Sequence, residues 1–137
     1  MKGRVLAPGS ASGQALVLSE PLSLWGGLDP TNGDVIDPHH PQRGASLAGR
    51  VVVMPAARGS SSSSSVLAEA ARAGVAPAAL LLGEPDLILA IGAAVADELY
   101  GVRIPVLALP PEELAGIPDS GNVDIGEDGR IELAGTL

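Results

Sequence analysis

Three short apolar runs, separated by two segments with helical spacing, constrain the fold of this 137-residue chain most strongly. The runs cover residues 50–54, 78–82 and 104–109. The first, RVVVM, is β-branched and bounded by Gly49 and Pro55, as a buried strand is. Because strand–helix–strand crossovers within one sheet are right-handed, the order predicts a parallel sheet at the centre of an α/β domain.

Both intervening segments have the spacing of amphipathic helices. The apolar residues of the first are Val66, Leu67, Ala70 and Ala71, and those of the second are Leu87, Ile88, Ile91, Val95 and Leu99. Gly74 is expected to end the first helix. Pro85 fits the first turn of the second helix, and Gly101 is expected to end it.

Additional β structure is expected on both sides of this centre. The N-terminal part predicts a hairpin-like pair of strands at residues 4–6 and 14–18, with a turn at residues 8–13 between them. Residues 21–49 are dense in Gly and Pro, which predicts an ordered loop region without a long helix. The tail predicts a hairpin that turns at Asp128 and Gly129. The length suits one domain spanning residues 1–137.

The composition limits both the core and the chemistry. The chain has no Phe and single copies of Trp25 and Tyr100, so small aliphatic side chains must fill the interior and its elements must approach closely. Trp25 is expected to plug this core, with an interface anchor as the alternative. Cysteine is absent, so the chain forms no disulfide and cannot by itself hold a cysteine-ligated zinc ion or iron–sulfur cluster.

The charge balance narrows the range of partners. Sixteen carboxylates oppose eight scattered bases, giving a net charge of -8, which argues against nucleic-acid binding. No uncharged stretch reaches the roughly 20 residues that a membrane span needs, and the N-terminus lacks the apolar region of a signal peptide. We therefore expect a cytoplasmic protein with no membrane partner.

Six successive serines, residues 60–65, follow Gly59 between the first buried strand and the first helix. Serine tracts are typical of flexible linkers, but connections of this kind are usually short and ordered. Gly59 would allow a tight turn, and Ser60, Ser61 and Ser62 would occupy the positively polarised helix N-terminus. The surplus of hydroxyls favours a catalytic turn that binds an anionic substrate, and structural capping is the alternative.

A serine in this turn would need N–H donors and exclusion of water to act as a base. Activation by histidine is disfavoured, because no G-x-S-x-G pattern is present and the sequence has no histidine besides His39 and His40. These histidines also lack the spacing of metal ligands. We expect a structured loop in which Asp37 forms an Asx turn ahead of Pro38.

Five segments together carry a resemblance to a known family: GSASGQALVLSEPLSLWGGLDP, DVIDPHHP, SLAGRVVVMP, RGSSSSSS and GVAPAALLLGEPDLILAIGA. With them the chain resembles, over almost its whole length, the small swivel-domain component of the aconitase X enzymes, a branch of the aconitase superfamily. The resemblance implies a single swivelling β/β/α domain.

The resemblance also implies a division of labour between two subunits. Ser60 would abstract the substrate proton, while Gly59, Ser61 and Ser62 would shape a turn that holds a carboxylate. An iron–sulfur cluster in a separate large subunit would polarise the departing hydroxyl, so this chain would bind no metal by itself. The isolated chain is then expected to be inactive.

Two substrates are known for enzymes of this kind. The serine-only stretch after Gly59 and the single lysine look more like relatives that dehydrate cis-3-hydroxy-L-proline. Relatives that dehydrate mevalonate 5-phosphate are the alternative. A non-catalytic scaffold or carboxylate-binding module is a second alternative.

One departure from the superfamily concerns substrate binding. An arginine commonly stands shortly after the catalytic serine and clamps a carboxylate, whereas this chain has Ser61 and Ser62. Backbone N–H groups, hydroxyls or a partner's arginine would then hold the carboxylate. Arg58 is a possible substitute, although a solvated role is expected for it.

Overall fold

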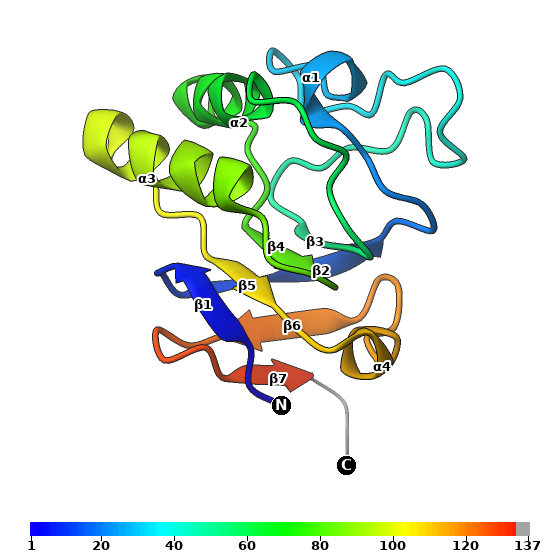
Figure 1. Cartoon of the computed structure of the whole chain (residues 1–137), viewed down its shortest axis with the longest axis vertical. Coiled ribbons are helices and arrows are strands. Elements are labelled where there is room, and N and C mark those ends of the chain that lie inside the picture. Colours follow the sequence, from blue (N-terminus) through cyan, green and yellow to red (C-terminus); the bar gives the residue numbers. More distant parts are fainter. Residues whose placement is uncertain (134–137) are drawn as a thin grey trace.

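The computed structural model describes residues 1–133, which form one curled mixed sheet with the two long helices on one face (Figure 1). Its strands are β1 (Arg4–Ala7), β2 (Ala11–Val17), β3 (Val51–Met54), β4 (Ala79–Leu82), β5 (Val106–Ala108), β6 (Asn122–Ile125) and β7 (Ile131–Leu133). Its helices are α1 (Leu24–Gly27), α2 (Ser63–Arg72), α3 (Leu87–Tyr100) and α4 (Pro111–Leu114). None of the helices in residues 1–133 has the length and apolar character needed to span a membrane.

The predicted parallel centre is confirmed. The sheet order is β1-β5-β4-β3-β2-β6-β7, in which β2, β3, β4 and β5 run parallel. Helices α2 and α3 are the crossovers from β3 to β4 and from β4 to β5, and Figure 1 shows both on the same face of the sheet. The opposite face carries α4 and the β6–β7 hairpin (Figure 1). The domain therefore has a mixed α/β fold, as expected.

The two faces of the central strands enter two separate cores. Side chains such as Val52 and Leu80 face the helices, where they meet Leu67 of α2. Their neighbours Val53 and Leu81 face α4 and the hairpin. This alternation follows from the two-residue repeat of a strand, and it explains why each central strand is apolar throughout.

The expected N-terminal hairpin was wrong. Strand β1 pairs with β5 at one edge, whereas β2 pairs with β3 and β6, so the two strands do not pair with each other. Strand β2 also begins at Ala11, inside the expected turn. Its first half is antiparallel to β6 and its buried second half is parallel to β3, which makes β2 the strand on which the sheet curls. The C-terminal hairpin is confirmed, with Gly129 at φ 90° in its turn.

The predicted C-terminal ends of α2 and α3 are confirmed, whereas the predicted start of α3 is not. Gly74 and Gly101 follow α2 and α3 in the left-handed conformation, with φ values of 77° and 65°. Pro85, however, lies ahead of α3 rather than in its first turn. Asp86 is the N-cap, and its Oδ1 accepts a hydrogen bond from the backbone N of Leu89 at 2.9 Å.

The expected apolar packing face of α3 was wrong. The helix buries Leu89, Gly92, Ala93 and Ala96, whereas Leu87, Ile91 and Leu99 are 72%, 56% and 64% exposed. The reason is the close approach of α2, because a Cβ atom on Gly92 would lie 2.9 Å from the backbone oxygen of Ser64. Small residues therefore bring the helices together, as the composition predicts, and the large ones remain outside.

The expected role of Trp25 as a core plug was also wrong. Its side chain is 60% exposed, and Leu18, Leu22, Leu24 and Leu28 fill the nearby core instead. Residues 21–49 contain only the short α1 and isolated bridges, as expected for an ordered loop region. Trp25 is thus an exposed aromatic residue close to the start of α2, where its backbone N donates to Ser63 Oγ at 3.2 Å.

His40 has a structural place in this loop region. It is 6% exposed, its Nε2 lies 3.0 Å from the Glu20 carbonyl oxygen, and its Nδ1 accepts from the backbone N of Gln42 at 3.1 Å. Together these contacts require the proton on Nε2. Asp37 Oδ1 accepts from the backbone N of His39 at 2.9 Å, so the predicted Asx turn is confirmed.

Candidate functional site

The serine turn, residues 55–62, connects the carboxyl end of β3 to α2. The next connection, residues 83–86, lies at the same edge because β3 and β4 are parallel. In open α/β sheets this edge is where ligands bind. The topology therefore brings the serine turn and the N-terminus of α3 together at the position expected of a functional site.

Hydrogen bonds distinguish serines that the sequence leaves equivalent. Ser63 is 3% exposed, and its hydroxyl accepts the backbone N–H of Trp25, so it links α1 to α2. Ser60 is half-buried, while Ser61 and Ser65 are exposed. Ser63 therefore has a structural role, and Ser60 retains a hydroxyl at the border between the protein and solvent.

The turn has an unusual capping pattern. Ser62 occupies the N-cap position but makes no side-chain cap hydrogen bond. Instead, Ser60 Oγ accepts from the backbone N of Ser62 at 3.3 Å, and the Ser60 carbonyl accepts from the backbone N of Ser63 at 2.9 Å. A backbone N–H donor thus points at the Ser60 hydroxyl, which is the interaction that would stabilise negative charge on this oxygen.

In the second half of the turn, the backbone N–H groups of Gly59, Ser60 and Ser61 have no acceptor within residues 1–133. The expectation that Gly59 permits a tight turn was wrong, because its φ lies outside the left-handed region and a Cβ atom there would meet nothing within 4 Å. Its missing side chain leaves the backbone open to an approaching group. Free donors beside an open backbone can bind an anion.

The serine turn borders a shallow hollow at the N-termini of the two helices. Its lining residues are Ala57, Arg58, Gly59, Ser60, Ser63, Asp86, Ile88 and Leu89. Arg58 is exposed and is the basic residue of this lining. Asp86 is acidic at a helix start, which the helix dipole alone explains, and we assign it no catalytic role. It belongs to this lining because the helix that it caps starts at the same sheet edge.

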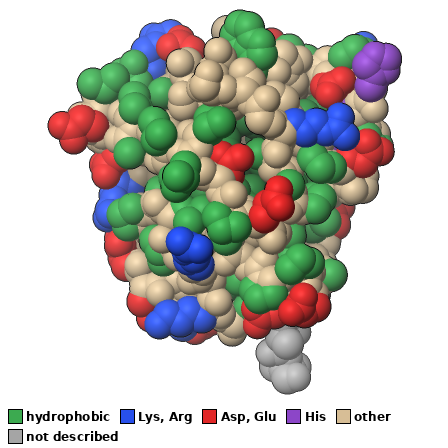
Figure 2. Space-filling view, viewed as in Figure 1, with side chains coloured by type: hydrophobic (Ala, Val, Ile, Leu, Met, Phe, Trp, Pro, Cys, Tyr) green, Lys and Arg blue, Asp and Glu red, His purple; other side chains and the backbone are tan. Residues whose placement is uncertain are grey.

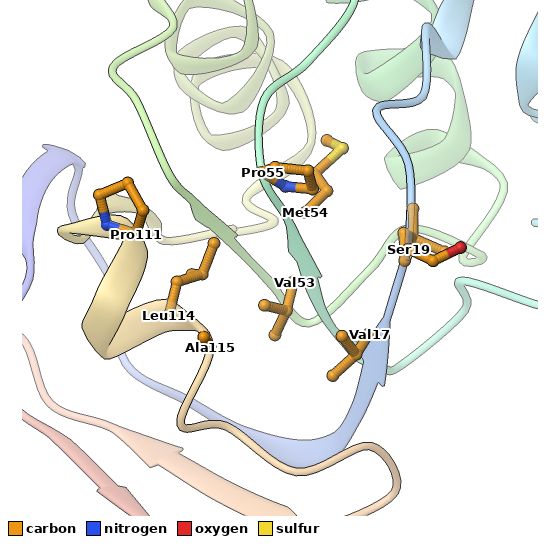
Figure 3. A pocket seen from close by; sticks show the side chains of 9 residues that line it. Val17, Ser19, Val53, Met54, Pro55, Pro111, Leu114 and Ala115 are labelled. Atoms are coloured by element: carbon orange, nitrogen blue, oxygen red, sulfur yellow. The ribbon is translucent and has the colours of Figure 1, made fainter.

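A separate apolar cavity of about 220 Å³ lies at the carboxyl ends of β2 and β3. It is lined by Val17, Leu18, Ser19, Val53, Met54, Pro55, Pro111, Leu114 and Ala115. Figure 3 shows Val53 of the sheet and Leu114 of α4 on two of its sides, with Ser19 as the hydroxyl-bearing residue. This lining suits an apolar group and offers nothing to hold an anion.

The residues of this chain do not fit an iron–sulfur cluster. The sequence has no cysteine, and no group of three or more His, Asp or Glu side chains within residues 1–133 is placed to hold a metal ion. His39 and His40 lie in the loop after α1, and His40 uses both ring nitrogens in contacts with the backbone.

The family profile described as "Aconitase X swivel domain" matches residues 1–133. The chain belongs to this family. The curled sheet with two helices on one face is the fold that this chain shares with a solved aconitase X structure. The chain's structural relatives include the crystal structure of Thermococcus kodakaraensis aconitase X in the holo form, with a TM-score of 0.86 and 32% identity over 96% of this chain and 95% of that chain.

Two kinds of curated relative are similar to this aconitase X swivel domain. One is cis-3-hydroxy-L-proline dehydratase of Pseudomonas aeruginosa, which is 49% identical over 95% of this chain but of which the chain spans only 22%. The other is the phosphomevalonate dehydratase small subunit of Methanothermobacter thermautotrophicus, which is 39% identical over 95% of this chain and 96% of the relative.

Proposed function

We propose that this chain is the small subunit of a cytoplasmic hydro-lyase that dehydrates cis-3-hydroxy-L-proline. The observation that carries the proposal is the 49% identity with the dehydratase named for that substrate, against 39% with the phosphomevalonate dehydratase small subunit. The position of the serine turn at the carboxyl edge of the parallel strands supports a catalytic use of this region.

Ser60 is the general base of the proposed reaction. Its deprotonated oxygen takes the proton from the carbon next to the substrate carboxylate as the C–H bond breaks, and the hydroxyl on the neighbouring carbon leaves as hydroxide. The proton and the hydroxide together make up the water that is lost. The Ser62 N–H, 3.3 Å from Ser60 Oγ, stabilises the deprotonated oxygen. The free N–H groups of Gly59 and Ser61, with the Ser61 and Ser62 hydroxyls, hold the substrate carboxylate.

The proposed active site is completed by a large subunit. An iron–sulfur cluster held there would supply the Lewis acid that polarises the leaving hydroxyl, since this chain has no cysteine to ligate one. The large subunit also covers the Ser60 hydroxyl, which is half-buried in the isolated chain. Exclusion of water strengthens the N–H interactions on which a serine base depends.

Mevalonate 5-phosphate is the second candidate substrate. It is favoured by the full-length match, since the chain covers 96% of the Methanothermobacter small subunit named for phosphomevalonate. A phosphate would bind the same free N–H donors as a carboxylate. The two candidates therefore differ in the substrate and not in the role of Ser60.

An assay with both substrates tests the proposal. The chain is purified alone and in complex with its aconitase X large subunit, and water loss from cis-3-hydroxy-L-proline and mevalonate 5-phosphate is measured. The proposal expects turnover of the proline derivative by the complex and none by the chain alone. Turnover of the phosphate ester only would establish the second candidate. An inactive complex with a loaded cluster would favour a non-catalytic scaffold.

A further inference from the structure

The outward side of α3 carries a stripe of exposed apolar side chains, here called the α3 stripe. It consists of Leu87, Ile91, Val95 and Leu99, which are 72%, 56%, 36% and 64% exposed. Residues four apart lie on one side of a helix, so the stripe extends about 18 Å along α3. Figure 2 shows hydrophobic side chains gathered over α3. A contiguous apolar surface of this kind marks an interaction site.

The α3 stripe begins beside the serine turn. Leu87 stands between Asp86 and Ile88, and both of these neighbours line the hollow that contains Ser60. Trp25 is 60% exposed and lies in α1, and its backbone N–H donates to the Ser63 hydroxyl at the start of α2. A partner that covers the α3 stripe and Trp25 would therefore also cover the serine turn.

The charges beside the α3 stripe identify the kind of partner. Helix α3 carries Asp97 and Glu98 and no basic residue, and Glu84 and Asp86 precede it. Two basic residues lie beside these four carboxylates: Arg103, which pairs with Asp97 at 3.7 Å, and Arg58 in the hollow, so the surroundings of the stripe have an acidic excess. In a parallel pair of α3 helices, the carboxylates of Asp97 and Glu98 would face their own copies. In an antiparallel pair they would face Glu84 and Asp86. Both arrangements bring together two surfaces with an excess of carboxylates, so a second copy of this chain fits poorly.

We infer that the α3 stripe, with Trp25, is the docking surface for the large aconitase X subunit, which meets it with an apolar patch bordered by Lys or Arg. The inference rests on the proposed function, because that proposal requires a large subunit. It adds the face of the domain that binds this partner. It also gives a physical reason for the outward side chains of α3, since burial in the complex compensates for their exposure in the isolated chain.

The experiment measures the affinity of the chain for the purified large subunit by calorimetry. Ile91→Glu and Leu99→Glu are each expected to weaken binding by about 10-fold or more, because each would bury a carboxylate in an apolar contact. Val5→Glu is the matched control, since Val5 is 39% exposed on β1 and should leave binding unchanged. Ile91→Ala, which adds no charge, should weaken binding less than Ile91→Glu. Far-ultraviolet circular dichroism checks that each variant is folded.

The possible outcomes separate this inference from the proposed function. If both glutamate variants bind like the wild type, or if Val5→Glu weakens binding as much as they do, the docking surface is wrong while the role of Ser60 stands. Ser60→Ala should bind normally and lose turnover, which tests the proposed function alone. Failure of the wild-type chain to bind would overturn both. A dimer of the isolated chain that Ile91→Glu disperses would assign the α3 stripe to self-association and also overturn the inference.

Discussion

Two connections at the same sheet edge solve the same structural problem in different ways. Residues 83–86 pass directly from β4 to α3, and the Asp86 carboxylate caps the helix. Residues 55–62 take a longer path from β3 to α2, and the N-cap Ser62 makes no side-chain cap hydrogen bond. The first connection has the features that stability alone would select.

The difference indicates what the longer connection is for. The serine turn leaves the N–H groups of Gly59, Ser60 and Ser61 without an acceptor in residues 1–133, and it places one donor on the Ser60 hydroxyl. Unused donors contribute nothing to folding, but they are available to a bound anion. The contrast between the two turns is therefore a contrast between a structural helix start and a helix start available for binding.

The contact that holds the two helix starts together should be the most sensitive to mutation. Gly92→Ala places a Cβ atom 2.9 Å from the backbone oxygen of Ser64, so α2 and α3 must separate. We expect the free energy of unfolding to fall by about 1–3 kcal/mol, as measured by urea denaturation. Gly59→Ala is the matched control, since its Cβ meets nothing within 4 Å and its stability should not fall. Equal stability of both variants would contradict the close approach of α2 and α3.

The two N-caps should differ in the same assay. Asp86→Ala removes the carboxylate that accepts the Leu89 N–H and is expected to cost about 1 kcal/mol of unfolding free energy. Ser62→Ala removes no cap hydrogen bond and should change stability by less than about 0.5 kcal/mol. Similar losses for both variants would mean that the serine turn is capped like its neighbour, and the contrast between them would fail.

A smaller effect is expected on the polar side of α2. The Arg72 guanidinium hydrogen-bonds Glu69 and lowers the pKa of that carboxyl. A carboxyl whose pKa is lower in the folded state stabilises the fold above its unfolded pKa, and this contribution is lost as the pH falls through the folded pKa. Arg72→Ala should therefore raise the pKa of Glu69, measured by carbon-13 NMR titration, and make stability depend less on acidic pH. An unchanged pKa would show that the pair does not form in solution.

The sequence predicts the centre of the fold well because the buried strands there are recognisable from consecutive residues alone. Runs such as 50–54 are apolar on both faces and bounded by Gly and Pro, which leaves few alternatives to a buried parallel strand. The packing face of α3 could not be predicted in the same way. Hydrophobic spacing selects the large side chains, whereas the space beside α2 admits only residues such as Gly92 and Ala96.

The candidate site shows the same limit. The sequence predicts a functional turn at a serine-rich helix start, but six identical residues give no basis for deciding which hydroxyl has the catalytic role. What distinguishes Ser63 from Ser60 is the hydrogen bond that the Ser63 hydroxyl accepts from the backbone N–H of Trp25, a residue 38 positions away in the chain. The exposure of Trp25 was missed because an isolated aromatic residue is usually taken as part of the core.

The most direct test of the account is the turnover of the Ser60→Ala variant in complex with the large subunit, with cis-3-hydroxy-L-proline as substrate. We predict a loss of about 10²-fold or more, because the variant lacks the proposed general base. Ser65→Ala, a change within the same serine run, should keep wild-type turnover. Wild-type turnover by Ser60→Ala would contradict the account and leave this serine with a capping role only.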